Sequence, residues 1–227
     1  MSRFPQPSDS YGSLRDIQIL VNQDPVLLNK KIKEKLTNIR SDKIDWVSPL
    51  EDDDFSEYRD EAFLERLGIK PAKIPLNSFW PARGSQWDAL GKGKNKEVFL
   101  VEAKANIPEM VSPPTGASEK SLAKIRKALL DTKNYLKIRN DIDWAKQFYQ
   151  YTNRLAHLYF LRILNKIPAY LVFLYFLDDT SVDGPKTIAE WEAAITVMKK
   201  YLGISRHRLE RFVADVFIDV KELTVTD

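Results

Sequence analysis

The sequence predicts an α/β protein in which a central mixed β-sheet is flanked by helices. Residues 169–177 form a near-continuous apolar run, which is typical of a strand covered on both faces. Residues 84–106 contain two apolar arms around a turn rich in glycine and lysine, which predicts a β-hairpin. Elsewhere apolar residues recur at helical spacing, as at Leu122, Ile125 and Leu129.

The N-terminal part predicts a helical extension of this sheet. Residues 1–12 are polar and contain two prolines, so we expect a loose arm. After a short apolar segment over 14–21, Asp24 and Pro25 mark a helix start, and apolar residues follow at helical spacing through Ile39. Residues 44–50 are expected to be a connector. The predicted division is an N-terminal arm and helical extension over 1–49 and an α/β domain over 50–227, in one compact unit.

The segment before the hairpin predicts one helix and one strand. Residues 55–67 should form a helix that Gly68 ends, and the acidic run 51–54 suits its N-terminus. Glu57 and Glu61 belong to an acidic stripe on this helix, and a solvated face explains most such stripes. Residues 76–81 are predicted to be the first core strand, which leads into the hairpin.

The chain after the hairpin predicts alternating helices and strands. A loop over 107–118, a basic helix from 119, an apolar helix over 143–165 and the strand 169–177 are expected in that order. A helix over 187–202 ending at Gly203, a short helix over 206–211 and an edge strand over 213–220 complete the prediction. The basic residues between 120 and 139 either line a path for a phosphate backbone or form a solvated face.

Composition limits the class of protein and the kind of metal site that this chain can form. At 227 residues and 44% hydrophobic content, the chain is long enough to bury one good core. The absence of cysteine excludes disulfides and thiolate sites, and two histidines make zinc unfavourable, so a metal with oxygen ligands remains. The net charge of +3 is compatible with a polyanionic partner. With no signal peptide and no apolar run that could span a bilayer, we expect a cytoplasmic protein without membrane contact.

The hairpin carries the residues that are typical of a catalytic site. Side chains alternate along a strand, so Glu102 and Lys104 should share one face, and Asp88 on the preceding arm should lie near Glu102. Buried charges are costly unless they are paired or bind a metal. Two carboxylates and a lysine would suit Mg²⁺ and a phosphodiester under attack. The alternative is that all three are solvated residues at strand ends.

Asp88, thirteen intervening residues, and Glu102-Ala103-Lys104 resemble the signature of the PD-(D/E)XK nuclease superfamily, although the proline of its name is absent. The superfamily includes restriction endonucleases, Holliday-junction resolvases and RecB-like nucleases. The resemblance implies a restriction-endonuclease-like core and metal-dependent phosphodiester hydrolysis. It assigns Mg²⁺ or Mn²⁺ to Asp88, Glu102 and Ala103, and gives Lys104 the role of positioning water or stabilising charge. It also implies a first-helix acid, for which Glu57 fits the resolvase-like spacing to Leu64 and Gly68, with Glu61 as the alternate.

The helix over 143–165 adds candidate substrate-binding residues. Gln147 and Tyr151 resemble the QxxxY element of RecB-like nucleases. Gln150, Asn153, Arg154 and His157 follow along one polar stripe, although His157 is more simply explained as a core histidine. The expected partner is nucleic acid, with DNA preferred, and a homodimer remains open. The alternatives are a non-catalytic nucleic-acid-binding module or a protein-interaction module on a nuclease-like fold. A glycosidase is disfavoured because the lysine suits phosphate charge.

Overall fold

The computed structural model describes residues 2–70 and 73–223 and has an α/β fold built on a five-stranded mixed sheet. The strands lie in the order β2 (Ile44–Ser48), β4 (Ala89–Gly93), β5 (Val98–Lys104), β6 (Ala169–Leu177) and β7 (Val213–Asp219). The first three are antiparallel neighbours, whereas β5, β6 and β7 are parallel. A separate ribbon pairs β1 (Arg3–Phe4) with β3 (Glu57–Tyr58). The predicted mixed sheet is therefore confirmed.

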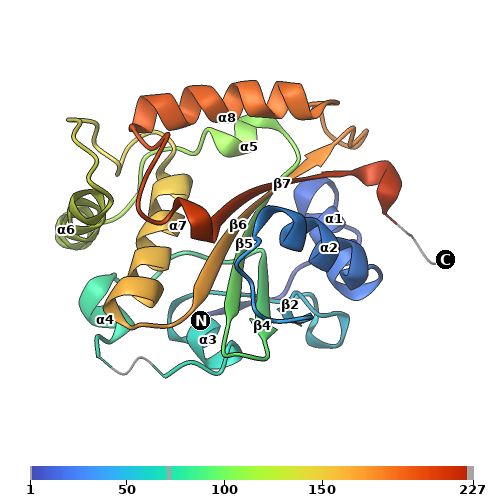
Figure 1. The fold of residues 1–227 in the computed structure, drawn as a ribbon, viewed down its shortest axis with the longest axis horizontal. Helices are drawn as coiled ribbons and strands as arrows, with labels where there is room; N and C mark the ends of the chain where they lie inside the picture. Colours follow the sequence, from blue (N-terminus) through green and yellow to red (C-terminus); the bar gives the residue numbers. More distant parts are fainter. Residues whose placement is uncertain (1, 71–72, 224–227) are drawn as a thin grey trace.

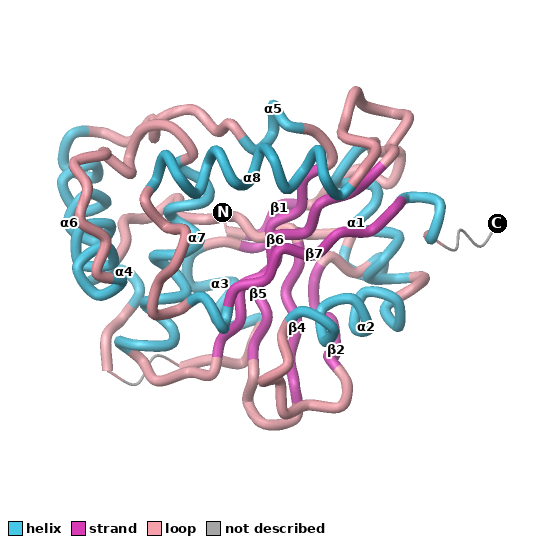
Figure 2. Tube along the Cα trace, turned by 45° about the horizontal axis from the view of Figure 1, so that its top comes forward, coloured by secondary structure: helices cyan, strands magenta, loops and turns pink. Residues whose placement is uncertain are grey.

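Helices cover both faces of this sheet. The described helices are α1 (Gly12–Asn22), α2 (Pro25–Lys35), α3 (Asp60–Arg66), α4 (Leu76–Phe79), α5 (Ile107–Met110), α6 (Glu119–Leu136), α7 (Tyr149–Tyr159) and α8 (Ile188–Leu202). Figure 1 shows α1 and α2 on one side of the strands and α7 on the other, with α6 outside α7. The strands run between these two groups of helices (Figure 2).

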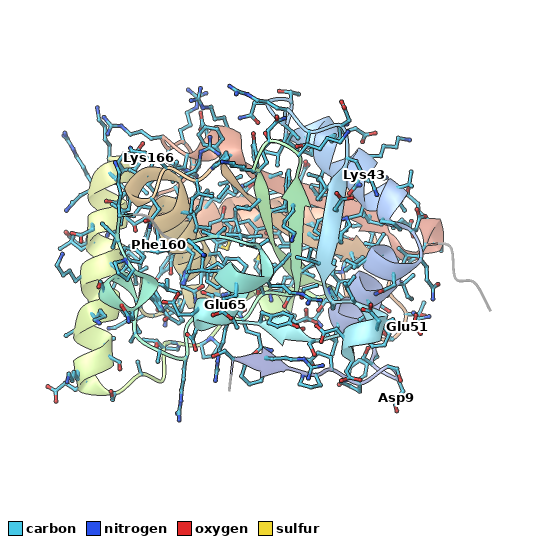
Figure 3. All side chains as sticks on the ribbon, turned by 90° about the horizontal axis from the view of Figure 1, so that it is seen from below. Asp9, Lys43, Glu51, Glu65, Phe160 and Lys166 are labelled. Carbon is cyan, nitrogen blue, oxygen red and sulfur yellow. The ribbon has the colours of Figure 1, made fainter. Side chains whose placement is uncertain are left out.

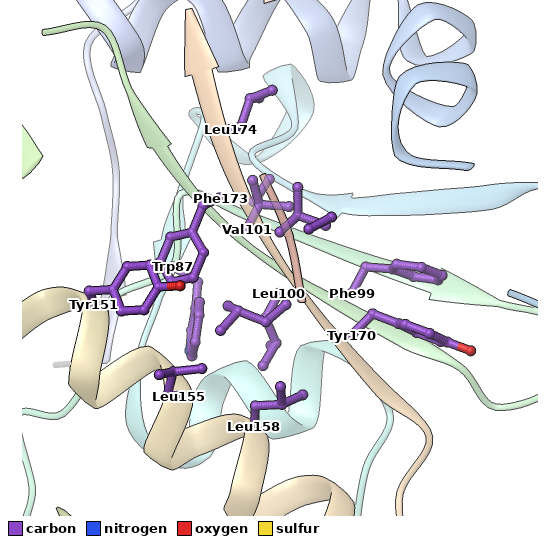
Figure 4. Close-up of a cluster of buried hydrophobic side chains, with 14 of the residues drawn as sticks. Trp87, Phe99, Leu100, Val101, Tyr151, Leu155, Leu158, Tyr170, Phe173 and Leu174 are labelled. Atoms are coloured by element: carbon purple, nitrogen blue, oxygen red, sulfur yellow. The ribbon is translucent and has the colours of Figure 1, made fainter. Parts of the chain in front are cut away.

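Strand β6 is the centre of the core because all nine of its residues are buried, as its apolar sequence predicts. On the α7 face, the ring of Tyr151 stacks on Phe173 with centroids 4.1 Å apart (Figure 4). Trp191 of α8 contacts Tyr175 on the same face. On the opposite face, Phe99 of β5 stacks on Tyr170 at 5.2 Å. Aromatic layers thus hold β5 and β6 in register and exclude water from both faces.

The hairpin prediction is confirmed. Strands β4 and β5 are antiparallel, with Ala89 opposite Val101 and Leu90 opposite Leu100. Strand β2 approaches β4 so closely that a Cβ atom at Gly91 would lie 2.6 Å from the Ile44 side chain. Only glycine fits there, because a methyl group would push β2 away from the sheet. The hairpin therefore lies inside the sheet, and β5 has a hydrogen-bonded strand on each side.

The prediction of a first core strand over residues 76–81 is wrong. Leu76–Phe79 forms the short helix α4, which buries Leu76 and Phe79 three residues apart on one face. The strand beside β4, at one edge of the sheet, is instead β2, from the stretch that we expected to be a connector. Its burial alternates, with Ile44, Trp46 and Ser48 inward and Asp45 exposed. This period of two is the signal that the connector prediction missed.

Two helix predictions differ from the structure at their N-termini. The helix expected over 55–67 begins only at Asp60, because Asp54 and Phe55 have positive φ angles of 50° and 48°, which α-helices do not allow, and Glu57–Tyr58 pairs with β1 as a strand. Similarly, the helix expected from residue 143 begins at Tyr149, after Phe148 with φ of 58°. It ends in a π-helical turn over Phe160–Leu164. These breaks move Glu57 onto β3 and place Gln147 before α7.

Other predicted boundaries shift by smaller amounts. The apolar segment over 14–21 lies in helix α1, and α2 ends at Lys35 rather than continuing to Ile39. The loop expected over 107–118 contains helix α5. The short helix predicted over 206–211 is a 3-10 turn at Glu210–Phe212. The helix over 187–202 is confirmed, with a Thr187 capping box at its start and Gly203 at its end.

Helix α1 buries an ionisable group that should make stability depend on pH. Asp16 is 1% exposed, and neither carboxylate oxygen has a hydrogen-bond partner among the described residues. Burial, with Asp179 and Glu109 nearby, raises the pKa of Asp16 from 3.8 to about 7. The native state then holds the proton more tightly than the unfolded chain. The free energy of unfolding should therefore fall as pH rises between these two pKa values.

We expect Asp16→Asn to remove this pH dependence, because asparagine cannot ionise. The variant should be more stable than the parent by about 4 kcal/mol at about pH 8, and no more stable at about pH 4. Urea unfolding at both pH values measures the difference. Asp9→Asn is a matched control, since Asp9 is exposed on the N-terminal arm (Figure 3). Equal stability of Asp16→Asn and the parent at the higher pH would contradict the burial of a charged Asp16.

Within residues 2–70 and 73–223, the structure contains no helix whose length and apolar character would allow it to cross a bilayer. The longest of the described helices, α6, has 18 residues and carries four lysines and one arginine. Four of its basic side chains bind groups within the protein: Lys124, Arg126, Lys127 and Lys133. A solvated and internally paired face explains these four residues without a phosphate backbone.

Candidate active site

Glu102 on β5 lies at the centre of a buried charge cluster, and it is 2% exposed. Lys104, two residues further along the same face, donates from Nζ to Glu102 Oε1 at 2.5 Å. Arg154 of α7 donates from Nε to Glu102 Oε2 at 2.6 Å. Each carboxylate oxygen of Glu102 therefore has a cationic partner. The face shared by Glu102 and Lys104 follows from strand alternation, as the sequence predicts.

Two more carboxylates adjoin this pair. Asp88 lies immediately before β4, and its Oδ2 accepts a hydrogen bond of 2.6 Å from the backbone N–H of Ala103. Glu57 of β3 accepts a hydrogen bond of 2.5 Å from the Gln86 side chain. Glu57 is buried because β3 is held between β1 and the chain at Trp87, which bridges to Tyr58. Three separate segments thus bring acids to the C-terminal end of β5.

The pKa values within the cluster diverge. Burial, together with the negative charges of Glu102 and Glu57, raises the pKa of Asp88 well above its ordinary value. Burial also raises the pKa of Glu57 to about 6, with Glu102 adding to the effect. Burial opposes ionisation of Glu102 too, but Arg154 and Lys104 outweigh it and lower the pKa of Glu102. The ionised form of Glu102 is therefore stabilised, whereas added positive charge would be needed to favour the ionised forms of Asp88 and Glu57.

Arg154 is held in place by the structure around it. Its guanidinium also donates to the Gln86 backbone oxygen at 2.6 Å and to Asn153 Oδ1 at 2.8 Å, and it lies over the Trp87 ring. Ser85 donates to the same Asn153 oxygen. Partners on three sides fix the guanidinium, which the sequence predicted to bind substrate, against Glu102 instead. Arg154 is 4% exposed.

A cleft of about 870 Å³ leads to this cluster, and Lys104 forms part of its lining. One wall is the loop 111–118, and the others come from the chain before β4 and from α6 and α7. Polar lining residues include Arg83, Glu109, Tyr149, Gln150 and Asn153. The volume lies within the range of ligand-binding clefts. Lys104 is therefore the group of the cluster that a ligand in the cleft would reach.

The structure does not bring every predicted site residue to this cluster. Glu61 is exposed on α3, so Glu57 is the acid that the fold brings close, on a strand rather than a helix. Gln147 precedes α7 and contacts the hydroxyl of Tyr201. Tyr151 lies in the core against Phe173. The QxxxY pattern therefore does not reach the charged groups, because α7 starts two residues after Gln147.

Two further predicted residues have clear positions. Gln150 lines the cleft, and its backbone N–H donates to Ser112 of the cleft loop at 2.8 Å. His157 is 1% exposed, and its Nδ1 lies 2.8 Å from the Asn153 backbone oxygen. Burial lowers the pKa of His157 to about 4. A neutral histidine packed between Trp87 and Phe63 matches the core-histidine interpretation.

Two functional neighbours were missed from the sequence, Ser85 and Gln86, whereas Asn153 belongs to the polar stripe that the sequence indicated. Gln86 lies two residues before Asp88, so both side chains point to the same side of an extended segment, and this spacing was an available signal. Asn153 directly precedes Arg154 on α7. No local pattern indicates that Asn153 and Ser85 meet, because they are 68 residues apart in the chain.

The donor chemistry of the cluster fits a hard divalent cation. Its oxygen ligands are those that Mg²⁺ prefers, and burial together with the neighbouring carboxylates raises the pKa values of Asp88 and Glu57. In the described part of the chain, however, no group of three or more acidic, histidine or cysteine side chains is arranged to hold a metal ion. Glu102 would have to release Lys104 or Arg154 from one oxygen before that oxygen could bind a cation.

Comparison with protein-family models, with curated proteins and with solved structures finds no match to this chain. The chain combines a mixed sheet, whose central strand β5 carries Glu102 and Lys104, with an acid on each of two neighbouring segments. Lys104 also lines a cleft.

Proposed function

We propose that this protein is a metal-dependent nuclease with a restriction-endonuclease-like core. One observation carries the proposal: Glu57, Asp88, Glu102 and Lys104 converge at the end of β5, beside a cleft that reaches Lys104. The sheet order supports it, because β4, which Asp88 immediately precedes, and β5, which carries Glu102, are adjacent and antiparallel. The likeness to the PD-(D/E)XK superfamily lies in the short motif of Asp88, Glu102 and Lys104, because residues 76–81, which we expected to be its first core strand, form helix α4.

Each residue of the cluster would have its own role in phosphodiester hydrolysis. Asp88, Glu102 and the backbone oxygen of Ala103 would hold Mg²⁺ or Mn²⁺. The bound ion would lower the pKa of a water and neutralise charge on the phosphate. Lys104 would orient the attacking water or stabilise the phosphate oxygens from the cleft side. Because the pKa of Glu57 is about 6, its carboxylate would be mostly ionised at neutral pH and would be able to accept a proton.

The cleft favours a phosphate-bearing substrate over a sugar. Two of its lining residues, Arg83 and Lys104, are cations, and Tyr149 offers an aromatic surface. Cations and aromatic rings are the groups that bind the backbone and bases of nucleic acids. The proposed partner is therefore nucleic acid, with DNA as the first substrate to test. The protein would act at this site without membrane contact.

Calorimetric titration with Mg²⁺ and Mn²⁺, followed by cleavage assays on plasmid DNA, single-stranded DNA and RNA, tests the proposal. We expect saturable metal binding and metal-dependent cleavage in the parent, and both should be lost in Asp88→Asn. Asparagine keeps an acceptor for the Ala103 N–H, so the fold should survive. Asp45→Asn removes an exposed carboxylate from β2 and serves as the control. A parent protein that neither binds metal nor cuts any substrate would refute the nuclease assignment.

One observation favours a second function, a nucleic-acid-binding module without cleavage. Both oxygens of Glu102 are held by internal cations, so the cluster is electrostatically satisfied without metal. Such a site could bind a backbone phosphate at Lys104 and leave it intact. Salt-dependent oligonucleotide binding, unchanged by EDTA and without cleavage in Mg²⁺ or Mn²⁺, would favour this function.

A further inference from the structure

A second cavity, of about 350 Å³, lies at the opposite end of the sheet from Lys104. It is built where β5 and β6 begin and where the chain enters β7. Its lining includes Arg40, Glu97, Arg162, Tyr170, Arg211 and Phe212. The length of β5 separates the cavity from Lys104 by about 20 Å at the usual rise of a strand. This arginine pocket is thus separate from the candidate active site.

The carboxylate in the arginine pocket, Glu97, forms no ion pair with the described arginines that line it. Glu97 is 2% exposed, and its carboxylate oxygens accept hydrogen bonds from uncharged donors. It accepts hydrogen bonds from the backbone N–H groups of Arg40 and Ser41, from the Ser41 hydroxyl and from the Tyr170 hydroxyl. These bonds lower the pKa of Glu97 despite its burial, so they favour its ionised carboxylate form. The described residues form no ion pair with the guanidinium groups of Arg40, Arg162 or Arg211.

Two of the arginines contact the same aromatic ring. The guanidinium carbon of Arg162 lies 3.2 Å from the Phe212 ring centroid, and that of Arg211 lies 4.6 Å from it. Arg162 is fixed further by a hydrogen bond of 2.7 Å to the Ala169 backbone oxygen. Burial and the charge of Arg211 lower the pKa of Arg162, although Tyr170 opposes this. Like charges held this close repel each other, and a bound anion would relieve the repulsion.

We propose that the arginine pocket binds a phosphate group that carries two negative charges, as in a phosphate monoester. The planar guanidinium donates in pairs to phosphate oxygens, and three arginines with one carboxylate leave a net charge of +2 for a dianion to balance. The side-chain amides of Asn38 and Asn95, which also line the cavity, add neutral donors. The cavity volume suits one phosphate group or a small phosphorylated molecule.

Calorimetric titration of the full chain with inorganic phosphate and pyrophosphate tests the arginine pocket directly. We expect saturable binding to the parent and at least a tenfold weaker affinity in Arg40→Gln/Arg211→Gln. Arg162 is left intact because it packs on Phe212 and holds the Ala169 carbonyl. Arg139→Gln/Arg206→Gln removes the same charge from exposed positions elsewhere and should bind like the parent. No saturable heat up to about 10 mM phosphate, or equal weakening in both double variants, would overturn the proposal.

A second comparison identifies the source of the phosphate. The probes are a nucleoside 5′-monophosphate and matched oligonucleotides with a 5′-phosphate or a 5′-hydroxyl end. Preference for the phosphorylated oligonucleotide, lost in Arg40→Gln/Arg211→Gln, would assign the pocket to nucleic-acid ends. Binding of the mononucleotide alone would assign it to a small phosphorylated ligand. Equal binding of both oligonucleotides, unaffected by the double variant, would overturn the monoester assignment. These outcomes do not depend on metal or cleavage, so they are independent of the nuclease proposal.

Discussion

Lys104→Met is expected to reduce metal-dependent cleavage by about a thousandfold, because it removes the cation that contacts both Glu102 and the cleft. Methionine keeps much of the lysine stem, so packing at the end of β5 should change little. Arg154 still pairs with Glu102 in the variant, which protects the fold. Single-turnover cleavage at saturating Mg²⁺, with the substrate found in the panel above, measures the loss.

A matched control for this substitution is Lys94→Met, which removes an exposed lysine from the turn between β4 and β5. It should cut at the parent rate. Lys104→Arg should recover part of the activity if charge matters more than the exact position of the ammonium group. Cleavage by Lys104→Met at the parent rate would remove Lys104 from the mechanism and, with it, the functional meaning of the Glu102-Ala103-Lys104 motif.

Arg154→Met is expected to destabilise the protein by about 3–5 kcal/mol, because it removes one partner of a buried ion pair and leaves Glu102 with Lys104 alone. The hydrogen bonds to the Gln86 carbonyl and to Asn153 are lost as well. Their buried acceptors would then lack a donor, which adds to the cost. Urea unfolding at neutral pH, analysed with the same m-value for parent and variant, gives the difference in free energy.

The control for this loss is Arg126→Met, at the exposed ion pair of Arg126 with Asp143. It should cost less than about 1 kcal/mol, because solvent screens that pair. In a double-mutant cycle, Glu102→Gln should recover part of the stability of Arg154→Met, because the buried charge that needed Arg154 is gone. If Arg154→Met is no more destabilising than Arg126→Met, the pair of Arg154 and Glu102 does not hold α7 against β5.

Much of the sheet could be predicted from local sequence. The burial of β6 follows from an apolar run of nine residues, and the hairpin follows from two apolar arms around a polar turn. Strand β2 was missed because Pro49 and a short length resemble a connector, although its alternating burial is present in the sequence. Residues 76–81 were misassigned because Phe79 and Trp80 favour a strand locally, whereas packing of Leu76 and Phe79 favours a helical turn.

The sequence by itself determined that Glu102 and Lys104 share a face of β5, because strand alternation is a local rule, and that Asp88 lies near them, because hairpin pairing is short-range. Only the tertiary structure decided which other groups join them. Glu57 is brought in by the pairing of β3 with β1, and Arg154 by the packing of α7 on β6. The positive φ at Phe148, a single backbone angle set by surrounding contacts, starts α7 late enough to exclude Gln147. Contacts between distant segments depend on how whole elements pack, and no local pattern of residues encodes that packing.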